Sequence, residues 1–157
     1  MKDTSLTSSI LAFLDQIGIP NQPKILDETC ILPGVLIDKG ILYYDLSRLE
    51  NPGDLIHEAG HIALMTQDER NKIVGNVKEY RSPAEDDELG VLAWSYAASK
   101  YLDLKPEVIF HENGYHGQSS QLVHGYATGQ NLGLPLLVWM NLCDYETYPA
   151  MKKWVRE

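Results

Sequence analysis

The amino-acid sequence predicts an α+β fold, and three observations carry this prediction. Apolar residues recur at helical spacing in several segments, most clearly near the N-terminus and between residues 84 and 102. The stretch 31–45 instead shows two short apolar runs around a turn, which is typical of a β-hairpin. The chain has 157 residues, so we expect one domain that spans 1–157.

The first elements in the chain are a predicted helix and the hairpin. Residues 5–17 carry apolar side chains at helical spacing, and the Gly-Ile-Pro sequence at 18–20 ends this helix. In the hairpin, the runs 35–37 and 41–44 flank a turn in which Gly40 supplies a positive φ. A small sheet early in the chain is therefore expected.

Two longer helices follow in the prediction. Asn51 and Pro52 have the residue types of a helix start, and that helix runs to about Thr66. The polar residues 67–83 predict a surface loop, either without regular structure or with a short strand at 73–74. Residues 84–102 form the most apolar predicted helix.

The last third of the chain predicts short elements. Pro106 opens a short helix, and the glycine-containing residues 111–120 form a loop. We expect helices over 121–128 and 135–142, and a last short helix over 148–157.

The chemistry of the chain is concentrated in the sequence His57-Glu58-Ala59-Gly60-His61, which matches HExxH. Residues four apart share one face of a helix, so both imidazoles can converge on one metal ion. Glu58 is rotated by about 100° and lies beside that ion, where it can take a proton from water. The alternative is a helix with two solvated histidines, but the surrounding residues are apolar and predict burial.

This sequence resembles the zincin-like metallopeptidases. The order of hairpin, HExxH helix and acidic apolar helix over residues 34–102 is similar to the small ImmA/IrrE-type group. The resemblance implies a zincin-like fold, in which a small hairpin-based sheet packs on the HExxH helix with several further helices. It also implies Zn²⁺ as the cofactor and a peptide or protein as the substrate.

The third metal ligand is expected on the helix after the motif. The metzincin continuation of HExxH is excluded, because Leu64 and Gln67 stand where it needs glycine and histidine. The gluzincin-like alternative uses a glutamate, and the segment from Glu88 resembles the frame of the family. The helical stripe of Leu89, Leu92, Ala93, Tyr96, Ala97 and Tyr101 extends back to Glu88 and Glu85, so Glu88 is the first candidate and Glu85 the second.

Other charged and polar residues near these helices have less specific predictions. Asp86 and Asp87 are expected only to favour the dipole at the helix N-terminus. In gluzincins a downstream histidine or tyrosine stabilises the oxyanion, which makes Tyr115 and His116 candidate catalytic residues, with an ordinary loop role as the alternative. His111, His116 and His124 are the remaining ligand candidates if neither glutamate serves.

The leading functional hypothesis is a zinc metallopeptidase with His57, His61 and Glu88 as ligands and Glu58 as general base. Its substrate would lie extended against the edge strand of the hairpin sheet. The alternative is a zinc-binding regulatory or protein-interaction module without proteolysis.

Composition bounds the remaining function classes. The net charge of −9 argues against nucleic acid and anionic membrane as partners. Cys30 and Cys143 are too far apart in the sequence to indicate a metal motif or a disulfide framework, and no segment reads as a signal peptide or membrane span. We therefore expect a cytoplasmic protein, and the sequence leaves its oligomeric state open.

Overall fold

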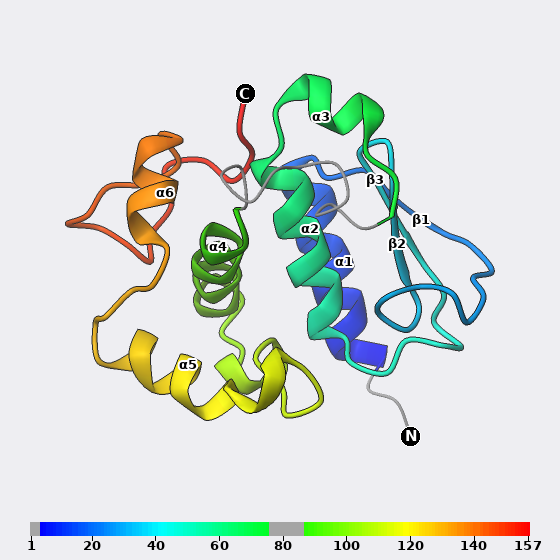
Figure 1. Ribbon diagram of the computed structural model, residues 1–157, viewed down its shortest axis with the longest axis horizontal. Coiled ribbons are helices and arrows are strands. Elements are labelled where there is room, and N and C mark those ends of the chain that lie inside the picture. Colours follow the sequence, from blue (N-terminus) through cyan, green and yellow to red (C-terminus); the bar gives the residue numbers. More distant parts are fainter. Residues whose placement is uncertain (1–3, 76–86) are drawn as a thin grey trace.

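The computed structural model describes residues 4–75 and 87–157 of the chain. Over these residues the fold is α+β, with six α-helices and one three-stranded sheet (Figure 1). No helix in the described part of the chain is long and apolar enough to cross a membrane. The helices are α1 (Thr4–Ile17), α2 (Gly53–Leu64), α3 (Gln67–Lys72), α4 (Glu88–Tyr101), α5 (Ser119–Ala127) and α6 (Leu134–Trp139).

The sheet confirms the predicted hairpin and adds one strand to it. Strands β2 (Val35–Asp38) and β3 (Ile41–Tyr44) are antiparallel, and β1 (Asn21–Pro23) pairs with β3 in parallel, giving the order β1-β3-β2. Lys39 and Gly40 both have positive φ, at 50° and 83°, as a two-residue hairpin turn requires. The sequence did not predict β1, because it has three residues, ends on proline and is defined by its pairing with β3.

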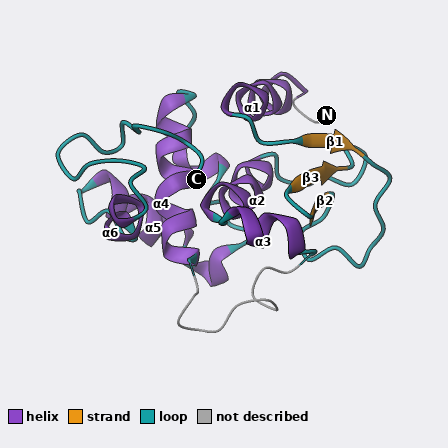
Figure 2. Ribbon diagram, turned by 90° about the horizontal axis from the view of Figure 1, so that it is seen from above, coloured by secondary structure: helices purple, strands orange, loops and turns teal. Residues whose placement is uncertain are grey.

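Helix α2 lies between the sheet and α4 (Figures 1 and 2). Its glycine, Gly60, permits this packing, because a Cβ there would lie 3.0 Å from Val91 Cγ1 and 3.1 Å from Trp94 Cε3. Trp94 is fully buried, so the two helices meet over one of the largest side chains of the core. The HExxH helix is therefore held from both sides, as its apolar composition predicted.

The predicted loop after α2 is wrong in its first half, because residues 67–72 form helix α3. Thr66 and Glu69 form a capping box, in which Thr66 Oγ1 accepts from the Glu69 amide and the Glu69 carboxylate accepts from the Thr66 amide. Val74 then pairs with Asp38 as an isolated bridge, which fits the short strand considered at 73–74. Residues 76–86, which include the rest of this predicted loop, lie outside the described part.

Helix α4 lies within the helix predicted over 84–102, but its predicted core stripe is partly wrong. Leu89 is 50% exposed and Tyr101 is 54% exposed, whereas every residue over 90–99 is buried. The reason is that α2 and α6 both pack against α4, so its middle is covered all round and only its two ends reach the surface.

The last third of the chain agrees with the sequence except at its end. A 3-10 turn at Pro106–Val108, then α5 and α6, stand where short helices were predicted. The predicted helix over 148–157 is absent, because this segment uses its backbone for distant contacts. The Lys152 amide donates to Leu142 O at 2.9 Å, and the Arg156 amide donates to Ala63 O, at the end of α2, at 2.8 Å.

Candidate metal centre

Helix α2 presents two imidazoles on one face, and the first residue of α4 meets them. Glu88 Oε1 lies 3.2 Å from His57 Nε2, and Glu88 Oε2 lies 3.1 Å from His61 Nε2. One ligand atom from each of the three residues lies within 4.8 Å of the others. His57, His61 and Glu88 are therefore close enough to hold a metal ion, in an arrangement compatible with a zincin motif.

The Nδ1 atoms of both imidazoles, which point away from Glu88, face oxygen atoms. Such outer contacts are typical of histidines that bind a metal through Nε2. His57 Nδ1 lies 3.3 Å from the Tyr115 hydroxyl, and His61 Nδ1 lies 3.7 Å from Asp87 Oδ1. The Asp87 carboxylate only accepts, so it favours the His61 tautomer with its proton on Nδ1, and this tautomer leaves the Nε2 lone pair available to a metal. The Tyr115 hydroxyl can serve His57 in the same way when it accepts from Nδ1. Two nitrogen donors and one carboxylate are also the donor set of an open zinc site.

The charges of the site fit a cation in the same place. Burial of His61 opposes its charged form, but the carboxylates of Asp87 and Glu88 outweigh burial and raise its pKa to about 10. Burial also opposes the charged form of Glu88, but hydrogen bonds with His57 and His61 prevail and hold its pKa far below the usual range. The carboxylates of Asp87 and Glu88 thus favour a positive charge at this place, and a bound divalent cation would supply it.

Asp87 corrects the prediction that it only favours the helix dipole. Asp87 is 4% exposed and its Oδ1 faces His61 Nδ1, so it has the place of a carboxylate behind a candidate ligand histidine. Of the two glutamates that the sequence left open, Glu88 contacts both histidines. Glu85 and Asp86 lie outside the described residues.

Tyr115 and His116 follow one another in a tight turn beside the site. Both have left-handed backbone conformations, with φ of 62° and 53°, which is uncommon for residues other than glycine. The turn directs the Tyr115 ring to His57, with 5.8 Å between the ring centroids. His116 lines both cavities beside the triad of His57, His61 and Glu88, and Tyr115 lines the smaller of them. The catalytic roles expected of these two residues remain predictions.

The sequence missed a hydrogen-bonded pair that connects the segment before this turn to α2. His111 Nε2 lies 2.7 Å from Oδ1 of Asp54, which is 3% exposed and lies one helical turn before His57. Burial raises the pKa of Asp54, and His111 opposes that shift. The signal in the sequence was a carboxylate on the apolar side of the HExxH helix, which needs a partner.

Two cavities meet at the triad. The larger cavity, of about 530 Å³, is bounded on one side by β2, and its lining includes Glu58 and all three candidate ligands. The smaller cavity, of about 330 Å³, is bounded on one side by α5, and its lining includes His57, Glu88 and Tyr115. Glu58 thus lies beside the ligands at the wall of a cavity, where a substrate and a water molecule have access.

Comparison with known proteins adds no relative. No protein-family model matches the chain, and neither the curated proteins nor the solved structures contain a significant match.

Proposed function

We propose that this protein is a zinc-dependent metallopeptidase with Glu58 as its general base. One observation carries the proposal: the Nε2 atoms of His57 and His61 meet the same Glu88 carboxylate, and Glu58 lines the cavity beside them. Such a ligand set leaves a coordination position for water, which distinguishes catalytic from structural zinc sites. The HExxH motif, whose glutamate serves as the base in metalloproteases, supports the same assignment.

In the proposed hydrolysis, the zinc ligands would hold the metal and Glu58 would transfer the proton. Bound zinc would lower the pKa of a water molecule and polarise the substrate carbonyl. Glu58 accepts one proton from the attacking water as the new C–O bond forms at the carbonyl carbon. Glu58 then passes that proton to the amide nitrogen as the C–N bond breaks, which yields a carboxylic acid and an amine.

The neighbouring residues position this machinery. Tyr115 orients His57, and Asp87 orients His61, each through the nitrogen that faces away from Glu88. Because the Tyr115 hydroxyl is directed to His57, we assign the oxyanion contact to His116, which lines both cavities.

Substitution of the proposed base tests this function. Glu58→Gln should retain zinc, because the side chain lies beside the ligands, and should retain the fold. Its rate of peptide cleavage should fall by about two to four orders of magnitude, because an amide cannot accept the proton. The matched control is Glu107→Gln, at an exposed position away from both cavities.

The measurements are zinc content by elemental analysis and cleavage of a mixed peptide library. Equal cleavage by Glu58→Gln and the wild type would contradict the mechanism. Zinc binding without cleavage of any peptide would favour the non-proteolytic module, and absence of zinc from protein never exposed to chelator would exclude both.

A further inference from the structure

We propose that the site selects an aliphatic stretch of polypeptide without acidic side chains, and that it does so mainly through side chains on both sides of the reacting peptide bond. This inference rests on the proposed peptidase function. It follows from the linings of the two cavities, from their charges and from the hydrogen bonds already made along β2.

Both cavities are lined by branched aliphatic side chains. The larger is bounded by Ile31, Leu32, Val35, Leu36, Ile37 and Val74. The smaller is bounded by Leu32, Leu89, Leu92, Leu122 and Leu132. Since both cavities also include His57, Glu88 and His116, a polypeptide that crosses the triad has an aliphatic cavity on either side.

The charges of the two linings disfavour acidic side chains. Among the described residues, neither lining contains lysine or arginine, whereas Glu58 and Glu88 line the larger cavity and Asp54 and Glu88 the smaller. Away from the zinc itself, a substrate carboxylate would therefore meet acidic side chains and no basic side chain from these residues. The net charge of −9 adds to this repulsion at longer range.

The chain itself occupies part of the β2 edge, which an extended substrate would otherwise pair with. The Gly75 amide donates to Ile37 O at 2.7 Å, and the Lys39 amide donates to Ile73 O at 2.9 Å. The Val35 amide, at the other end of β2, donates to Leu32 O at 3.3 Å. These bonds shorten the part of the β2 edge that is available for pairing with a substrate strand. The selectivity for the substrate must therefore come mainly from its side chains in the two cavities.

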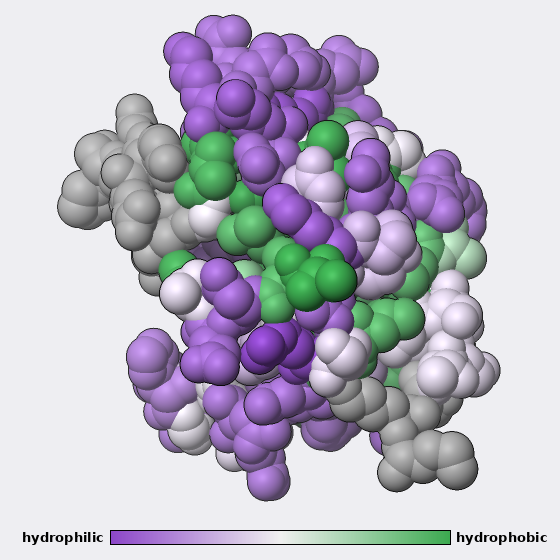
Figure 3. Space-filling model, turned by 90° about the vertical axis from the view of Figure 1, so that its right-hand side faces the viewer, coloured by the Kyte–Doolittle hydropathy of each residue, from purple (hydrophilic) through white to green (hydrophobic). Residues whose placement is uncertain are grey.

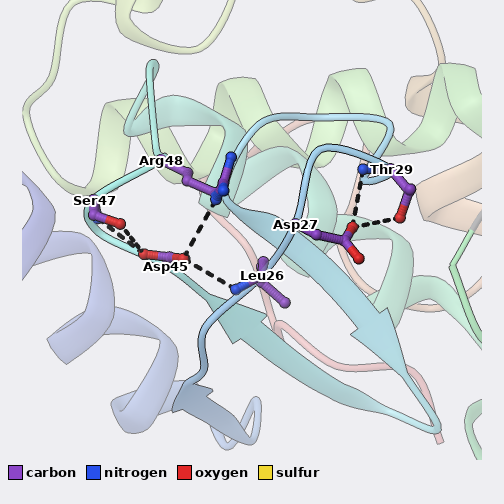
Figure 4. Close-up of polar contacts among 6 residues, drawn as sticks. All are labelled: Leu26, Asp27, Thr29, Asp45, Ser47 and Arg48. Carbon is purple, nitrogen blue, oxygen red and sulfur yellow. Dashed lines mark hydrogen bonds and ion pairs between the residues drawn. The ribbon is translucent and has the colours of Figure 1, made fainter.

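The loop over residues 24–34, between β1 and β2, contributes residues 29–32 to the wall of the larger cavity. Polar contacts hold this loop in place (Figure 4). Asp45 accepts hydrogen bonds from the amides of Leu26 and Ser47, each at 3.0 Å, and Asp27 accepts from the Thr29 amide at 2.9 Å. This loop presents Ile31 at 66% exposure. Figure 3 views the molecule from the right-hand side of Figure 1. It shows hydrophobic surface across the middle of that side, below the hydrophilic region at its top.

The test measures binding rather than catalysis. The zinc-loaded full chain is titrated with N-acetyl amino-acid hydroxamates that carry the same metal-binding group and the side chain of leucine, lysine or aspartate. We expect the leucine compound to bind at least about tenfold more tightly than the aspartate compound, as the burial of a small aliphatic group gives in other pockets. The lysine compound should lie between them.

Matched variants connect the preference to each cavity. Ile31→Arg, at the larger cavity, should reduce the disadvantage of the aspartate compound, whereas Ile25→Arg, in the same loop but outside both cavities, should not. For the smaller cavity the test is Leu132→Arg, and its control is Leu46→Arg at a similar exposure of 48% against 45%. All four positions are exposed, so the substitutions should not disturb the core. Thermal unfolding of each variant tests whether the fold is retained.

The outcomes separate this inference from the peptidase function. Equal affinity for the leucine and aspartate compounds, or equal effects of the test and control variants, would overturn the selectivity. Hydroxamate selectivity without peptide cleavage would support the aliphatic site and contradict the peptidase. Failure of every hydroxamate to bind would overturn both, because it would remove the open metal position.

Discussion

The Tyr115 hydroxyl lies 3.3 Å from His57 Nδ1, on the far side of the imidazole from the nitrogen that faces Glu88. In the proposed site, this relationship makes Tyr115 a positioning residue for His57. The turn that carries it is tied to the start of α2 by the buried pair of Asp54 and His111. The orientation of His57 thus depends on residues far away in the sequence.

Tyr115→Phe should therefore weaken zinc binding while the fold is retained. We expect a loss of about 10- to 100-fold in affinity, which is typical when the partner of a ligand histidine is removed. Competition with a chelator measures the affinity, and the visible spectrum of the cobalt-substituted protein should change. Tyr145→Phe, at a residue that is 57% exposed, is the control. An unchanged affinity and cobalt spectrum would contradict the positioning role.

Glu88→Ala should impair zinc binding more severely than Tyr115→Phe, because it removes the carboxylate that contacts both histidines. The loss should exceed the roughly 10- to 100-fold typical of an outer partner. Glu85→Ala should have a much smaller effect, and the exposed Glu107→Ala should have none. Chelator competition on the three variants decides the assignment: a larger loss in Glu85→Ala would move the ligand one helical turn.

Gly53→Ala should destabilise the protein at the start of the HExxH helix. A Cβ at this position would lie 2.0 Å from the carbonyl oxygen of Val108, so the backbone must move. We expect the free energy of unfolding to fall by about 1–3 kcal/mol. Urea unfolding in the presence of chelator measures the change without a contribution from metal.

Gly125→Ala is the matched control for this prediction. It lies inside helix α5, and its added Cβ would meet only the end of the flexible Gln130 side chain, at 3.1 Å. Its helix propensity should increase stability by about 0.5–1 kcal/mol. Equal urea midpoints for the two variants would show that the contact with Val108 is not restrictive.

The stability of the fold should decrease at alkaline pH. Burial raises the pKa of Tyr126 and of Tyr148, whose hydroxyls donate to Leu132 O and Ala93 O. In the unfolded chain both ionise near pH 10, so above that pH the unfolded state binds fewer protons than the native state. Each tyrosine then lowers the free energy of unfolding by up to about 1.4 kcal/mol per pH unit, until the native pKa is reached.

Urea unfolding at about pH 8 and pH 11, together with the absorbance of ionised tyrosine, tests this pH dependence. The absorbance should rise in step with unfolding. Tyr148→Phe should show a smaller loss between the two pH values than the wild type. A variant with the same pH dependence as the wild type would contradict the assignment to Tyr148.

The sequence predicted those features that local patterns determine. The hairpin and α2 carry their own turn and periodicity signals, so both appear where expected. Glu88 was the leading ligand candidate because the apolar stripe of the next helix extends back to it and because its segment resembles the frame of the zincin-like family. Helix α3 also had a local signal, the Thr66 and Glu69 capping box, which the charged composition of the segment obscured.

The features that were missed depend on distant parts of the chain. Strand β1 exists through its pairing with β3, and the final segment gives its backbone bonds to Leu142 and Ala63 instead of forming a helix. The burial of Asp87 beside His61 depends on how α4 approaches α2. No periodicity within one segment reports such contacts, which is why they were absent from the prediction.

The contact between Arg156 and α2 has a consequence for the order of folding. The Arg156 amide bonds to Ala63 O and its guanidinium bonds to Leu64 O, while Arg70 bonds to the Arg156 carbonyl. The carbonyl groups at the end of the ligand helix are thus satisfied across a long sequence separation, and such contacts close late because of their loop entropy. The helix that carries His57 and His61 would gain its final stability only as the whole chain condenses, so the candidate metal site would form with the last step of folding.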